Sequence, residues 1–141
     1  MRANLSIYHN CNEGEAWASA FMLYRHAQDC GVQAEMCELS SLGEERLRNG
    51  GYSVFILTHS GLRSLQKRMQ AANLWLDRLI YSILVLGDPL GAHSAAGLDA
   101  CLSEKGAVSV LDSLEVDFFK ARVIADWEDC VLQLATDLQA S

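Results

Sequence analysis

Short apolar runs bounded by turn residues mark the strands of this chain. Residues 5–9, 52–58 (YSVFILT) and 81–87 (YSILVLG) are such runs, and each is too short for a helix. The second and third each contain four consecutive apolar residues, which is typical of strands buried on both faces of a parallel sheet. Residues 32–39 roughly alternate apolar and polar side chains, as an edge strand does, and residues 107–111 are a fifth, shorter candidate.

Between these runs, apolar residues recur at steps of three and four, which predicts helices over residues 13–30, 65–80, 94–105 and 118–138. Alternating strands and helices with right-handed crossovers favour a doubly wound open sheet. We therefore predict one α/β domain over residues 1–141, with a five-stranded parallel sheet in the order 2-1-3-4-5 and helices on both faces, in three layers. Its ligand crevice would lie beyond the carboxyl ends of the strands. Three predicted loops surround it: residues 9–15, 59–66 and 88–95.

The composition limits the classes of function. Of the 141 residues, 50% are apolar and 21% charged, so the chain is long enough and apolar enough for a sizeable core. The acidic net charge of −7 argues against nucleic acid and anionic membranes as partners. Because we find neither a signal peptide nor an apolar segment of membrane-spanning length, we expect a cytoplasmic protein.

Cysteine and histidine spacing does not predict a metal site. The five cysteines include no C-x-x-C pair, and none of the four histidines are four residues apart. We expect the cysteines to be reduced and mostly buried, where they pack as small apolar side chains.

A set of residues in the C-terminal half follows a familiar order. Gly-Asp follows the fourth strand, a glycine-leucine spine follows in the next helix, and an acidic E-x-D precedes a last helix with a tryptophan. The residues are Gly87, Asp88, Gly97, Leu98, Leu102, Gly106, Glu115, Val116, Asp117 and Trp127. This pattern resembles short-chain flavodoxin-like domains, including the FMN domains of diflavin reductases such as the sulfite reductase flavoprotein. The resemblance extends more weakly over the rest of the chain.

The resemblance implies a flavoprotein of the electron-transport class, an oxidoreductase that binds FMN and exchanges electrons with a protein partner. The flavin would carry the chemistry, so no catalytic side chain is expected. The FMN site implied by the resemblance comprises Asn10, Cys11, Asn12, Glu13, Gly14 and Glu15 in the first loop, Thr58, His59, Ser60 and Gly61 in the second, and Gly87, Asp88, Pro89, Leu90 and His93 in the third.

The first of these loops lacks the hydroxyl side chains with which the family binds the FMN phosphate. Asn10 and Asn12 can donate amide hydrogens, but Glu13 and Glu15 would repel a phosphate. On an alternative interpretation, Asn12 simply caps the following helix and the two glutamates complement the helix dipole.

The other two loops also depart from the family pattern. Arg63, Lys67 and Arg68 stand where the family has acids, and such cations would stabilise an anionic reduced flavin. Pro89 and Leu90 replace the hydroxyl residues and the tyrosine that stacks on the flavin. Because a stacked aromatic ring contributes on the order of 1 kcal/mol, we expect FMN to bind weakly.

Two other α/β families fit the residues poorly. Cys11 and Asp88-Pro89 resemble parts of a low-molecular-weight tyrosine phosphatase, but the position of its phosphate-binding arginine holds Trp17. We therefore predict that Cys11 is not catalytic. A response-regulator receiver needs an aspartate where this chain has Thr58. The remaining alternative to an FMN electron carrier is a flavodoxin fold that has lost the flavin and serves as an interaction or regulatory module.

Overall fold

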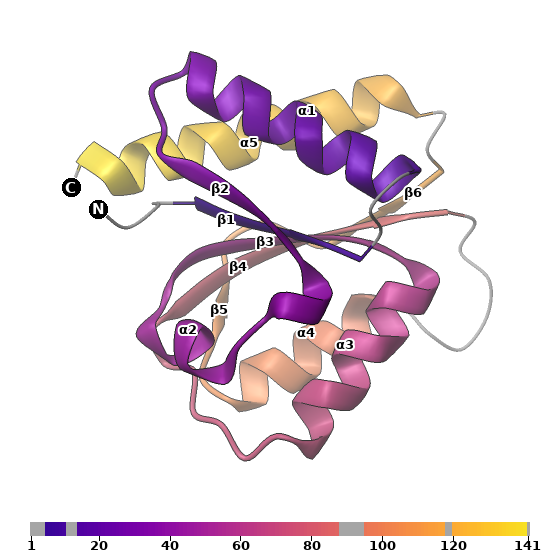
Figure 1. Ribbon diagram of the computed structural model, residues 1–141, viewed down its shortest axis with the longest axis vertical. Coiled ribbons are helices and arrows are strands. Elements are labelled where there is room, and N and C mark those ends of the chain that lie inside the picture. The colour runs from indigo at the N-terminus through magenta and orange to yellow at the C-terminus, as the bar shows by residue number, and fades with distance from the viewer. Residues whose placement is uncertain (1–4, 11–13, 88–94, 118–119, 141) are drawn as a thin grey trace.

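The computed structural model describes residues 5–10, 14–87, 95–117 and 120–140. Within them, strands and helices alternate along the chain (Figure 1). The elements are β1 (Leu5–His9), α1 (Glu15–Asp29), β2 (Ala34–Glu38), the 3-10 turn η1 (Leu39–Ser41), α2 (Glu44–Asn49), β3 (Gly51–Thr58), α3 (His59–Ala71), β4 (Leu79–Leu86), α4 (Ala95–Glu104), β5 (Val108–Ser109), β6 (Leu114–Val116) and α5 (Ala121–Ala140).

The sheet has the predicted strand order. Its strands run β2-β1-β3-β4-β5, and every pairing between neighbours is parallel. In β1, Leu5 lies opposite Ala34 on one side and Tyr52 on the other, so the strand order reverses beside β1. The prediction of a doubly wound α/β sheet is confirmed.

The fifth strand position is filled by two short segments. β5 pairs with β4 at Ile80 and Tyr81, and β6 pairs with β4 from Leu84 to Leu86. Between the segments, residues 110–113 lie opposite only Ser82 and Ile83, which makes this edge a bulge. The prediction of one fifth strand over residues 107–111 was therefore wrong in its bounds, because the structure has two segments, at Val108–Ser109 and Leu114–Val116. The alternation of side chains did not reveal the bulge because each segment is so short.

Helices cover both faces of the sheet, which gives the three predicted layers (Figure 1). α1 and α5 lie on one face, where Leu23 and Val131 join a core with Ile7 and Ile56. α2, α3 and α4 lie on the other face over a second core around Phe55. The apolar runs of β3 and β4 are buried from both sides, as parallel strands require.

The segment after β3 is helical. α3 begins at His59, directly after the strand, and ends at Ala71. The prediction of a loop over residues 59–66 was wrong, and the predicted helix over residues 65–80 is confirmed only over residues 65–71. The hydroxyl of Thr58 caps the helix by accepting a hydrogen bond from Gly61 N at 3.5 Å. Because Thr58 is both the last residue of β3 and the N-cap of α3, the helix follows the strand without an intervening loop.

The described cysteines are free thiols but are not mostly buried, which corrects the sequence prediction. Cys101 is buried, Cys37 is half-buried, and Cys30 and Cys130 are exposed. Burial raises the pKa of the Cys37 and Cys101 thiols. Among the described residues, no three metal-ligating side chains gather at one point. None of the described helices combines the length and apolar character needed to cross a membrane.

Candidate functional site

The carboxyl ends of β1 and β3 are joined by two side chains. Asn10 donates from Nδ2 to Thr58 Oγ1 at 2.8 Å, and its Oδ1 accepts from the backbone N of Thr58, also at 2.8 Å. Asn10 follows β1 directly and Thr58 is the last residue of β3. The amide therefore uses both its donor and its acceptor to fix this edge of the sheet.

The first turn of α3 packs closely against this pair. A Cβ atom at Gly61 would lie 2.3 Å from Asn10 Cγ, so only glycine lets the helix come so near. The hydroxyls of Thr58 and Ser60 lie 3.0 Å apart, within hydrogen-bond distance. Asn10, Thr58, Ser60 and Gly61 thus lie together as one contiguous cluster.

His59 lies on the β4 side of the same edge. A Cβ atom at Gly87 would lie 3.2 Å from His59 Cδ2, which places the imidazole against the glycine that follows β4. Gly87 has φ +132°, a conformation that favours glycine, and its N donates to Val116 O at 3.0 Å. Both ring nitrogens of His59 are buried without a hydrogen-bond partner among the described residues. Such a ring is costly unless a ligand supplies the partner.

Within the described part of the chain, no side chain caps the N-terminus of α1. Gly14, with φ 89°, is the residue before the helix, and it offers no side chain to the N–H groups of the first turn. Glu15, exposed in that turn, is the acidic residue nearest these donors in the described chain. Asn12, the alternative cap in the sequence, lies outside the described residues. Uncapped donors at a helix N-terminus can bind an anion.

A polar pocket of about 340 Å³ lies beside the Asn10 cluster, between η1 and α3. The sequence did not single out two of its lining residues, Ser40 and Ser64. Arg68, which also lines the pocket, donates to the backbone oxygens of Leu39 at 3.1 Å and Leu42 at 2.7 Å. The guanidinium thus holds the η1 segment against α3, and no run of apolar residues could have indicated this role.

Solved structures share this architecture. A short-chain flavodoxin associated with a non-canonical PDU bacterial microcompartment has 13% identity and a TM-score of 0.70, with 96% of this chain and 99% of that chain covered. A variant of flavodoxin from Pseudomonas aeruginosa has 16% identity and a TM-score of 0.67, covering 96% and 98%. A diflavin flavoprotein from Nostoc sp. has 12% identity and a TM-score of 0.62, covering 97% of both. The chain has a flavodoxin-like fold. No protein-family model and no curated protein matches its sequence.

Two of the residues that carried the sequence resemblance, Gly97 and Glu115, support the packing of α4. Glu115 Oε1 accepts a hydrogen bond from Ala95 N at 3.1 Å and so satisfies a donor at the start of α4. A Cβ at Gly97 would lie 2.8 Å from Gln66 Nε2, so α4 packs against the end of the Gln66 side chain of α3 at this glycine. These contacts explain why the motif identified the fold without identifying a ligand.

The structure describes about half of the predicted site. It brings Asn10, Thr58, His59, Ser60, Gly61 and Gly87 together at the carboxyl edge, and it places Gly14 and Glu15 at the start of α1. The other predicted residues lie outside the described part: Cys11, Asn12, Glu13, Asp88, Pro89, Leu90 and His93.

Proposed function

We propose that this flavodoxin-like protein is an electron carrier that binds FMN weakly at the carboxyl edge of its sheet. The observation that carries the proposal is the pair of buried ring nitrogens of His59, next to Gly87, which have no hydrogen-bond partner among the described residues. Because an isoalloxazine ring has several nitrogen and oxygen atoms, it offers both donors and acceptors to such an imidazole.

The start of α1 supplies the complementary group for the other end of FMN. A phosphate would be held by the first N–H groups of α1 after Gly14, which no described side chain caps. Glu15 carries negative charge into the same turn and opposes phosphate binding, so the affinity is expected to be low.

When bound, FMN would supply electron transfer in one- or two-electron steps. The protein's own residues would only bind and orient the flavin. A protein redox partner is the expected electron donor or acceptor, and the net charge of −7 would steer a basic partner toward it.

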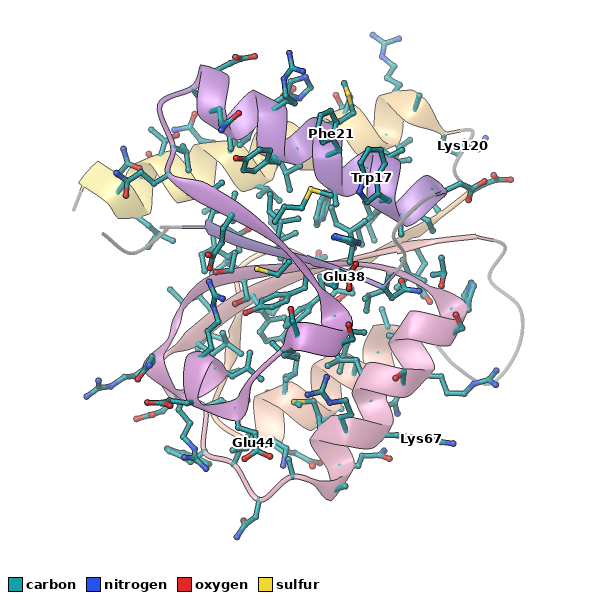
Figure 2. All side chains as sticks on the ribbon, in the orientation of Figure 1. Trp17, Phe21, Glu38, Glu44, Lys67 and Lys120 are labelled. Carbon is teal, nitrogen blue, oxygen red and sulfur yellow. The ribbon has the colours of Figure 1, made fainter. Side chains whose placement is uncertain are left out.

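A flavin-free interaction module is the second candidate, and a stacked aromatic pair with one exposed ring favours it. Trp17 and Phe21, both on α1, stack with ring centroids 5.2 Å apart and planes at 11° (Figure 2). Trp17 is 37% exposed. Exposed aromatic residues are enriched at protein interfaces. In addition, Asn10 and Thr58 already satisfy each other, so this pair does not need a ligand.

A melting series separates the two functions. A ligand that binds only the folded state stabilises it by RT ln(1 + [L]/Kd), or about 2.7 kcal/mol at a hundredfold excess over Kd. Millimolar FMN should therefore raise the melting temperature by several degrees, and riboflavin, which lacks the phosphate, should raise it less. If FMN leaves the melting temperature unchanged, the electron carrier is refuted and the interaction module takes its place.

A charge variant tests the placement of the phosphate. Glu15→Gln should tighten FMN binding several-fold, because it removes a carboxylate from the first turn of α1. The matched control is Glu44→Gln, in the first turn of α2 on the opposite face of the sheet (Figure 2). The two variants have the same net charge, so an equal effect of both would contradict a phosphate site at α1.

A further inference from the structure

A groove of about 390 Å³ runs between α1 and α5, on one face of the sheet. The two helices leave this space because Ala18 on α1 and Ala121 and Ala125 on α5 are too small to fill it. Met22, with 49% of its surface exposed, and Ile124 form apolar walls. The volume falls in the range of small-molecule sites, and the groove includes none of the residues proposed to hold FMN.

The groove contains one buried acidic group. Glu128 is only 5% exposed although it lines the groove. Its Oε2 lies 3.3 Å from His26 Nδ1, and His26 also lines the groove. Burial raises the pKa of the Glu128 carboxyl, and the neighbouring His26 partly opposes this rise. The carboxylate is thus desolvated, and among the described residues its cationic partner is an imidazole, which is charged only when protonated.

We propose that this groove binds a small organic ammonium ion, with the hydrocarbon part between Met22 and Ile124 and the ammonium group at the Glu128 carboxylate. Charge complementarity selects this occupant. A carboxylate can accept several hydrogen bonds, and His26 contacts one oxygen of the Glu128 carboxylate, Oε2. An ammonium group offers three donors and a full positive charge, whereas a carboxylate ligand would be repelled. The apolar walls favour an alkyl or aryl chain over a sugar or a peptide backbone.

Titration calorimetry with three ligands of one shape tests the charge preference. Hexylammonium should bind the protein at neutral pH, 1-hexanol should bind at least about tenfold more weakly, and hexanoate should not bind measurably. Equal binding of hexylammonium and hexanol would overturn the proposal, because it would show a purely apolar groove. Absence of hexylammonium binding would also overturn it.

Three variants locate the site. Glu128→Gln should abolish the preference for hexylammonium over hexanol. The matched control Asp126→Asn removes an exposed carboxylate from the same helix, and it should leave the preference unchanged. Ala125→Leu should fill the groove and weaken both ligands, and at this exposed position it should not disturb folding. Equal effects of the two charge variants, or unchanged binding in Ala125→Leu, would contradict a site in this groove. None of these outcomes depends on whether FMN binds.

Discussion

Asn10 and Thr58 lie 48 residues apart in the chain, yet each satisfies the other at the carboxyl edge of the sheet. The Asn10 amide donates to the Thr58 hydroxyl and accepts from the Thr58 backbone N, both at 2.8 Å. The same hydroxyl caps α3. One asparagine therefore connects the end of β1, the end of β3 and the start of a helix.

Removing that amide should destabilise the fold measurably. Asn10→Ala leaves the Thr58 N–H without this acceptor, and we expect a loss of about 1–2 kcal/mol in the free energy of unfolding, measured with urea. Thr58→Val should cost a similar amount. In the double variant the two losses should be clearly less than additive. Full additivity would show that the pair is not energetically coupled.

Substituting alanine at two helical glycines, Gly61 and Gly97, should affect the melting temperature differently. A Cβ at Gly61 would meet Asn10 Cγ at 2.3 Å in a fixed, hydrogen-bonded side chain. At Gly97 the nearest atom, 2.8 Å away, is the far end of the flexible Gln66 side chain. Because alanine gains up to about 1 kcal/mol in helix propensity over glycine, Gly97→Ala should be nearly neutral. Gly61→Ala should lower the melting temperature by several degrees, and equal melting temperatures would refute the contact.

Arg68 is expected to stabilise the fold through its hydrogen bonds rather than through its positive charge. Arg68→Met removes the hydrogen bonds to Leu39 O and Leu42 O and should cost about 1 kcal/mol. Lys67→Met is the control for loss of one positive charge, because Lys67 points away from the body of the protein (Figure 2). It should change stability by less than about 0.5 kcal/mol. Hydrogen exchange at residues 39–42 should accelerate in the first variant only.

The Glu128 carboxyl should leave a signature in the pH dependence of stability. Since burial raises its pKa in the folded state, the folded protein binds this proton more tightly than the unfolded chain. The free energy of unfolding should therefore fall as the pH rises from the usual glutamate range through the raised pKa. Glu128→Gln cannot lose a proton, so its stability should fall less over this range. Asp126→Asn removes an exposed carboxylate from the same helix and should follow the wild type.

His59 offers a test in which stability and binding change in opposite directions. His59→Phe removes two buried ring nitrogens that have no partner among the described residues. The FMN-free protein should gain about 1 kcal/mol of stability, because a desolvated polar group is replaced by an apolar ring. The stabilisation by FMN should decrease at the same time. A variant that is less stable and binds FMN as before would contradict the role proposed for His59.

The sequence by itself determined the architecture of this protein. The four-residue apolar runs in β3 and β4 predicted central parallel strands because only strands buried on both faces lack alternation. The helical periodicity that includes Trp127 predicted the closing helix, and Trp127 is buried against the sheet. These signals are local and repeat along the chain, so they need no knowledge of distant residues.

Tertiary structure alone decided where α3 begins and what surrounds the site. The first turn of α3 looks like a loop in sequence because it contains Ser60 and Gly61, and its helical start depends on contacts with Asn10. The groove between α1 and α5 joins Met22 to Glu128 across a hundred residues. Sequence patterns record whether a side chain is apolar and how often apolar side chains recur, but the partner of a polar side chain is chosen by the fold.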